Sequence, residues 1–287
     1  TLGSSATLVG TTFSGNQAKA GGAIRNDGQM TLVNTTLSGN LASESGGGLI
    51  NTTSDPLNPF AVSATVILIN STITNNEDQN SSGQNFNGAG VANFGSLTPK
   101  NSIIAGTNNN DDISNHFVGN SFSVGNNIIG NGGSISGFTN GTNNDFVGSE
   151  ISPVDPLLGA LQDNGGFTQT HVPTSISVAI DGGNNSSVAL DTADLDGDSN
   201  TTETVPFGQR GAGFSRINGT VDIGAVESLT GPNTAPSLTG DGVLAAVDED
   251  TADPAGETLA TLLSAQFVDP DVGAVLRGVA VVANASG

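Results

Sequence analysis

Hydrophobic and polar positions recur in a fixed order along the first half of the chain. Residues 7–16 read TLVGTTFSGN and residues 31–40, which lie 24 residues further on, read TLVNTTLSGN. A glycine-rich turn follows each copy, GGAIRN at 21–26 and GGGLIN at 46–51. The apolar runs are short, rich in β-branched residues and bounded by Gly and Asn. This pattern predicts short strands in a repeat architecture and does not favour helices.

The repeat extends over five copies when an Asn or Gly is aligned with the apolar residue three positions later. The apolar column comprises Phe13, Leu37, Ile73, Ile104 and Ile129. The polar column comprises Gly10, Asn34, Asn70, Asn101 and Asn126. A second column of turns ends at Asn26, Asn51 and Asn93. Five coils of one solenoid are therefore predicted between residues 1 and 148.

The spacing within one copy predicts a corner. Leu32 and Leu37 are an odd number of residues apart, so a straight strand would turn them to opposite faces. A bend near Asn34 lets both side chains point inward, and Asn tolerates the left-handed backbone that a tight corner needs. The expected fold is all-β, a right-handed single-stranded parallel β-helix in which like residues stack and corner Asn amides form a ladder. The handedness follows the general crossover preference and the family resemblance described below.

Two insertions interrupt the period. Residues 52–64 and 77–87 lengthen individual coils without changing the repeat on either side. Loops of this kind leave a solenoid intact and often carry binding specificity. With the repeats TTFSGNQAKAGGAIRN and TTLSGNLASESGGGLIN, the segment 1–148 resembles polymorphic-outer-membrane-protein repeats of bacterial surface β-helix proteins.

The amino-acid composition limits the classes of molecule that the protein is expected to bind. The chain has 27 Asp and Glu against 6 Lys and Arg, a formal charge of −21, and no Cys, Trp or Tyr. Such an acidic surface repels nucleic acid and anionic lipid and favours cations. The absence of Cys excludes disulfides and thiolate chemistry. No apolar run is long enough to span a bilayer, so we expect no membrane insertion in this chain.

Residues 149–230 have a different character. The blocks DPLLGALQDNGGFTQTHVPTSISVAIDGG at 155–183 and GQRGAGFSRINGTVDIGAVE at 208–227 resemble the C-terminal portion of the bacterial choice-of-anchor Q family. The resemblance implies a secreted β-helix protein with a β-rich C-terminal cap, displayed on the cell surface and without an established catalytic activity. Gly208 departs from the pattern, which has an acidic residue before Gln-Arg-Gly.

Residues 231–287 begin with the turn-rich linker GPNTAP. The acidic cluster 248–257 and the DPDVG stretch that starts at Asp269 resemble the start of cadherin-like or VCBS-type β-sandwich repeats. We expect an incomplete, truncated sandwich here, because the chain stops before such a repeat would be finished. Both ends of the chain look cut from a longer polypeptide. Calcium between sandwich repeats, at Asp269–Asp271 and at Asp248 with Asp250, is possible, but acidic turn residues are the preferred interpretation.

A calcium site is also predicted at DTADLDGDSNTTE, residues 191–203. Oxygen-bearing side chains alternate around a Gly turn, as Ca²⁺ with its six to eight oxygen ligands requires. The predicted ligands are Asp194, Asp196, Asp198, Asn200 and Glu203. Gly197 stands earlier than in an EF-hand and no flanking helix is evident, so a solvated acidic loop is the alternative.

Three further groups of polar residues are candidates for a catalytic or structural role. Parallel β-helices host glycosidases and lyases, and Asp111 with Asp112, near His116, could act as paired carboxylates. Adjacent residues on a strand face opposite sides, however, so turn residues are the default. His171 is expected to be a structural hydrogen-bonder, and Arg210 and Arg216 to pair with Asp181, Asp222 or Glu227 and close the end of the helix.

The sequence favours a non-catalytic, monomeric secreted or cell-surface protein. A β-helix would present loops that contact extracellular carbohydrate or a surface protein. The competing hypothesis is an enzyme that degrades extracellular polysaccharide. A cleft in which three or more carboxylates from successive coils converge would favour the enzyme, whereas a lateral face of Asn, Ser and Thr would favour adhesion.

Overall fold

The computed structural model describes residues 4–52, 64–79, 88–107, 111–117, 119–132 and 135–228, and, further on, residues 237–238, 258, 261, 263 and 266–268. The chain forms two compact units, Thr1–Leu229 and Thr230–Gly287. No helix within the described residues is long and apolar enough to cross a membrane. Most of the two predicted insertions, and the acidic turns at 248–250 and 269–271, lie outside the described residues.

The first unit is a parallel β-helix, as predicted. The first coil contains β1 (Ser5–Val9), β2 (Thr12–Ser14), β3 (Gln17–Ala20) and β4 (Ile24–Asn26). The second contains β5 (Gln29–Val33), β6 (Thr36–Ser38), β7 (Leu41–Ser45) and β8 (Leu49–Asn51). Each strand pairs in parallel with its counterpart one coil away, so that Leu8 lies beside Leu32 and Phe13 beside Leu37.

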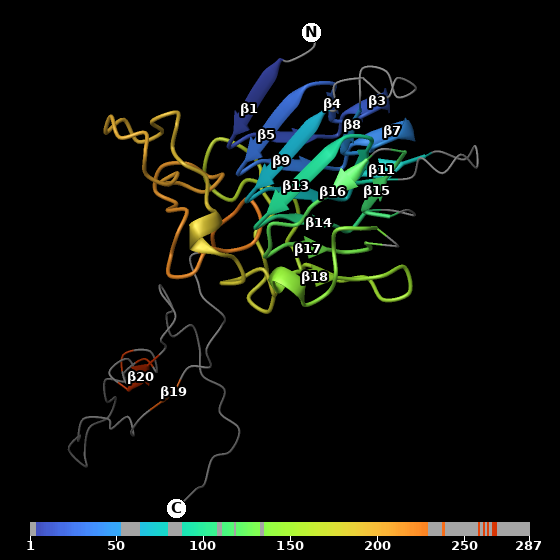
Figure 1. Cartoon of the computed structure of the whole chain (residues 1–287). Helices are drawn as coiled ribbons and strands as arrows, with labels where there is room; N and C mark the ends of the chain where they lie inside the picture. The colour runs from blue at the N-terminus through green and yellow to red at the C-terminus, as the bar shows by residue number, and fades with distance from the viewer. Residues whose placement is uncertain are drawn as a thin grey trace, which may run out of the picture. The chain divides into compact units, whose positions relative to one another are not determined.

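Later coils continue the four stacks. They comprise β9 (Thr65–Ile69), β10 (Thr72–Thr74), β11 (Glu77–Asp78), β12 (Val91–Asn93), β13 (Ser96–Lys100), β14 (Ile103–Ala105), β15 (Ile113–Asn115), β16 (Asn120–Ser121), β17 (Ile128–Ile129) and β18 (Phe146–Val147). The resulting sheets have the orders β1-β5-β9-β13-β16, β2-β6-β10-β14-β17-β18, β3-β7-β11 and β4-β8-β12-β15. We call them sheets A, B, C and D in that order; the strands of sheet A lie side by side in Figure 1.

The predicted corner separates sheets A and B. The polar column adopts the left-handed conformation at every level, with φ of 62° at Gly10, 48° at Asn34, 46° at Asn70, 47° at Asn101 and 55° at Asn126. Because the chain turns here, Leu32 and Leu37 are both fully buried, as expected. They belong to one core of stacked aliphatic side chains that also contains Leu68, Ile73 and Ile104. Each such burial contributes about 1.5–3 kcal/mol to folding.

Asparagine ladders exist, but in columns other than the predicted one. Asn26, Asn51, Asn93 and Asn115 are linked by amide hydrogen bonds of 2.8 Å between successive coils. A shorter ladder links Asn16, Asn40 and Asn76 at 3.0 and 2.9 Å. The prediction that the corner residues themselves form the ladder is wrong, because the backbone at the corner points their side chains away from the core.

The corner residues instead bind residues 149–228, which we call the flank segment. The amide of Asn34 donates to the carbonyl of Phe207 at 2.9 Å, and that of Asn126 donates to Gly182 at 2.9 Å. Asn101 both donates to the carbonyl of Asn184 and accepts from its N–H, each at 2.9 Å.

The flank segment also covers sheet B. Thr12 of the first coil donates to the carbonyl of Gln169, and Thr36 of the second donates to Gln209. Thr72 of the third coil accepts from the N–H of Ala225. Along the segment, contacts reach the first coil at Gln169, the fifth at Gly182, the first and second at Gln209 and the third at Ala225. The segment therefore passes along the side of the solenoid more than once (yellow to orange in Figure 1). The sequence predicted a cap that closes an end, and the contacts place this region on the flank instead.

One buried ion pair holds the C-terminal part of the flank segment. Arg216 is fully buried and bonds the Glu227 carboxylate at 2.9 Å. The same guanidinium donates to Asn34 of the corner column and to the carbonyls of Asp222 and Gly224. The predicted pairing of Arg216 with Glu227 is confirmed. Arg210 differs: it donates to the backbone carbonyl of Glu227 and stacks on the ring of Phe214.

The described residues of the second unit include one antiparallel pair, β19 (Ser237–Leu238) with β20 (Phe267–Val268). The predicted sandwich repeat falls mostly on residues outside those described, so it stays a prediction.

Candidate metal centre and acidic pocket

The predicted calcium loop is closed at its base by backbone pairing. Leu190 and Thr204 form an antiparallel bridge, and the N–H of Asp191 donates to the carbonyl of Glu203 at 2.8 Å. Val188, Ala189 and Val205, on either side of this bridge, pack against Val33 and Ile69 of sheet A. The loop base is therefore anchored to the solenoid, while residues 192–202 extend outward.

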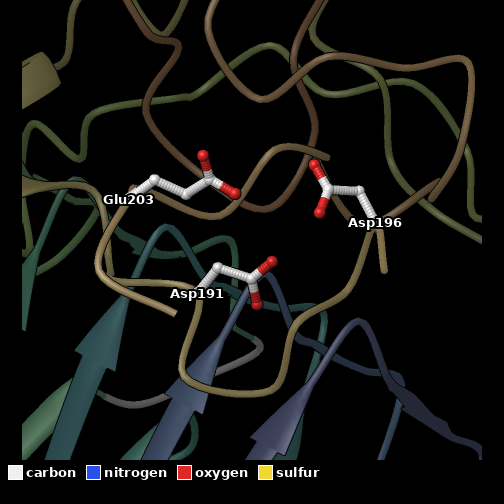
Figure 2. Close-up of side chains that lie close together, drawn as sticks. All are labelled: Asp191, Asp196 and Glu203. Carbon is white, nitrogen blue, oxygen red and sulfur yellow. The ribbon is translucent and has the colours of Figure 1, made fainter. Parts of the chain in front are cut away.

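Three carboxylates of this loop meet at its base. One oxygen each from Asp191, Asp196 and Glu203 lies within 4.8 Å of the others, and the carboxyl groups turn toward a shared space in Figure 2. Oxygens that share one calcium ion at 2.3–2.6 Å can be this far apart. Asp191 is buried, Glu203 is half-buried and Asp196 is exposed.

Two oxygens in this group have no hydrogen-bond partner among the described residues. Asp191 Oδ2 accepts from the N–H of Leu195 at 2.7 Å, whereas its Oδ1 has no partner. Glu203 Oε2 accepts from the Asn200 amide at 3.1 Å, and its Oε1 has none. Partial desolvation, together with the charges of Asp198, Asp196 and Asp191, raises the pKa of Glu203.

The other predicted ligands serve the loop's own turns. Asp194 and Asp198 form a second, more exposed group with Asp196. Asp194 accepts from the N–H of Ser199 at 3.1 Å, and Asp198 accepts from the N–H of Asn200 at 2.7 Å. The side-chain amide oxygen of Asn200 (Oδ1) accepts from both the N–H and the hydroxyl of Thr202. Sequence spacing thus identified the loop but missed Asp191, the first residue of the stretch.

An acidic pocket of ≈ 670 Å³ lies elsewhere on the solenoid. Four carboxylates line it, those of Asp111, Asp112, Glu150 and Asp155, together with the Asn131 side chain. Asp111 and Asp112 were expected to face opposite sides; they line the same pocket because they stand in the turn before β15 and not within the strand. His116 is not among the lining residues and packs against the ring of Phe94.

The carboxylates of this pocket are electrostatically distinct. Burial raises the pKa of Asp112 to about 6, although Thr107 and the N–H of Asn131 hydrogen-bond to both of its oxygens. Burial and the charge of Glu150 raise the pKa of Asp111. Within the described lining there is no Lys or Arg. The pocket therefore suits a neutral or cationic ligand and offers, in Asp112, a carboxyl group that can be protonated near pH 6.

His171 has a structural position, as predicted. Its Nε2 is 2.9 Å from the hydroxyl of Ser38 in β6, and its Nδ1 is 2.6 Å from the carbonyl of Gly159. Burial lowers the pKa of His171, and the bond to Gly159 partly opposes this. The ring ties the flank segment to sheet B.

Comparison of the chain with protein-family models, with curated proteins and with solved structures finds no match.

Proposed function

We propose that the protein is a non-catalytic, secreted or cell-surface scaffold that adheres to extracellular carbohydrate or to a surface protein. The observation that carries the proposal is the outward face of sheet A. The flank segment covers sheet B and also the outward row of sheet A that contains Val33 and Ile69. The two other outward rows of sheet A consist mainly of hydroxyl and amide side chains in register. The rows are Ser5, Gln29, Thr65 and Ser96, and Thr7, Thr31, Ile67 and Thr98.

This face suits a repeating, hydroxyl-rich polymer. Adjacent coils are spaced by about 4.8 Å, so its donors and acceptors recur at regular intervals. Ser5, Thr7 and Gln29 are exposed, and Thr31, Thr65 and Thr98 are half-buried. The formal charge of −21 disfavours nucleic acid and anionic lipid as partners. The resemblance to choice-of-anchor Q proteins supports secretion or surface display. We propose that the protein acts as a monomer, with calcium at residues 191–203 as a structural component.

The test is binding of the full chain to a panel of polysaccharides, with Thr65→Arg as the variant. A bulky cation in the centre of the sheet A face is expected to weaken binding about tenfold or more, because it blocks contact across adjacent coils. Ser43→Arg, an exposed position on sheet C, is the matched control and should bind as the unmodified chain does. Equal binding by both variants would exclude this face, and absence of binding throughout the panel would favour a protein partner.

A second function is supported by the acidic pocket. Two carboxylates from the turn before β15 and two from the start of the flank segment line the same pocket, as a polysaccharide hydrolase would require. Asp111, with its raised pKa, is the candidate general acid, and Glu150 is the candidate base or nucleophile. Product release from the same polysaccharide panel tests this: turnover that Asp111→Asn and Glu150→Gln both abolish, without loss of binding, would establish a hydrolase in place of the scaffold.

A further inference from the structure

The unpartnered oxygen of Asp191 is the strongest sign of an unassigned ligand in the described part of the chain. Asp191 has an exposed fraction of 0%. Around it, Val188, Ala189 and Val205 form an apolar wall. A buried carboxylate in such surroundings is normally paired with a cation or coordinates a metal.

No described Lys, Arg or His forms an ion pair with Asp191: the ion pairs between described residues are Lys19–Glu44, Arg25–Asp27 and Arg216–Glu227. Lys100 lines the same pocket as Asp191 but is not within ion-pair distance of it. Two more carboxylates, those of Asp196 and Glu203, lie within 4.8 Å. Three negative groups around one space repel one another, so the arrangement is unfavourable without a counter-ion.

We propose that Asp191, Asp196 and Glu203 hold a calcium ion, with Asp191 as its buried ligand. This proposal deepens the proposed function and rests on the calcium component of that function. It replaces the ligand set that sequence spacing predicted. The donor set is all oxygen, which suits Ca²⁺ and not Zn²⁺ or a softer metal. The free Oδ1 of Asp191 and the free Oε1 of Glu203 provide ligand atoms that no other group uses.

The alternative centre, Asp194 with Asp196 and Asp198, is weaker for two reasons. Asp196 and Asp198 are exposed, and Asp194 is half-buried. Neither Asp194 nor Asp198 has a buried oxygen without a hydrogen-bond partner, as Asp191 and Glu203 do. Because Asp191 and Glu203 stand at opposite ends of the loop, an ion between them would join its two ends at the point where the loop meets sheet A.

The experiment is calorimetric titration of the full chain with CaCl₂, with MgCl₂ as the comparison, and calorimetric melting with and without chelator. Calorimetry suits a chain without Trp or Tyr. Asp191→Asn and Glu203→Gln are each expected to weaken calcium binding at least about tenfold and to abolish the calcium-dependent rise in melting temperature. Asp198→Asn is the matched control, with the same loop and the same charge change, and should stay within about twofold of the unmodified chain.

Several results would overturn the proposal. One is no calcium-dependent change of the unmodified chain at about 1 mM. Another is loss of binding in Asp194→Asn or Asp198→Asn with binding retained in Asp191→Asn. Variants are compared in place of absolute stoichiometry, because Asp269 and Asp271 could hold a separate ion. The side chain that replaces the carboxylate in Asp191→Asn can still accept from the N–H of Leu195, so the loop should fold. If that variant does not fold, Glu203→Gln provides the test, because Glu203 is only half-buried. Failure here with intact polysaccharide binding would leave adhesion standing.

Discussion

At the scale of single residues, asparagine has two separate roles in this solenoid. In the ladders, Asn51 is fully buried and its amide bonds the next coil, so it satisfies polar groups inside the stack. At the corners, Asn101 has φ of 47° and directs its amide outward to the flank segment. In the ladders, asparagine contributes its hydrogen-bonding capacity. At the corners it contributes both that capacity and its tolerance of left-handed backbone.

The two contributions at the corner can be separated at Asn101. Asn101→Gly keeps the left-handed backbone but removes both bonds to Asn184, and we expect it to lower the free energy of unfolding by about 1–2 kcal/mol. Asn101→Ala also forces a Cβ-bearing residue without a polar side chain into that conformation, and should lose about 1 kcal/mol more. Urea unfolding followed by circular dichroism measures both. Equal effects of Ala and Gly would show that backbone strain makes no contribution here.

Asp112 makes stability depend on pH. Burial raises its pKa to about 6 from the 3.8 of an ordinary aspartate side chain. The folded state therefore binds a proton at the Asp112 carboxylate more tightly than the unfolded chain does. The contribution is fully present below pH 3.8 and is lost as pH rises through about 6, a change of about 3 kcal/mol. NMR titration of side-chain carboxyl carbons should give Asp112 a midpoint near 6. A midpoint near 4, the ordinary Asp value, would contradict the prediction.

At the scale of elements, the repeat could be predicted because its signals are local. Leu32, Asn34 and Leu37 lie within one turn of chain, and their spacing alone requires the bend that the structure contains. The position of residues 149–228 could not be predicted in this way. Contacts such as Thr36 to Gln209 join segments 173 residues apart, and no periodicity encodes them. The same limit hid Asp191, whose burial comes from Val188, Ala189 and Val205 packed against another element.

The buried ion pair of the flank segment should be far more important for stability than a surface pair. Arg216→Met leaves the buried Glu227 carboxylate without its cation, and we expect a loss of about 3–5 kcal/mol. Arg25→Met is the matched control: Arg25 pairs with Asp27 at an exposed site, so the loss should stay below about 1 kcal/mol. Calorimetric unfolding compares the two. Similar losses in both variants would mean that Arg216 does not hold the flank segment in place.

At the scale of the whole first unit, the flank segment changes how a solenoid holds together. Coils of a simple solenoid contact only their neighbours, so the end coils can separate one at a time. Here a single continuous segment is bonded to Thr12 in the first coil, to Thr72 in the third and to Asn126 in the fifth. Separation of one coil therefore also breaks bonds to a segment that the other coils hold.

The path of the flank segment also sets an order of assembly. The first coil is synthesised first, yet the residues that cover its sheet B strand, such as Gln169 and Gln209, follow Thr12 by 157 and 197 residues. Early coils can stack on each other as they emerge, because their pairing partners are near in sequence. Their outward threonines must stay hydrated until almost the entire unit has been made, so the flank segment docks only after the coils that it covers have been synthesised.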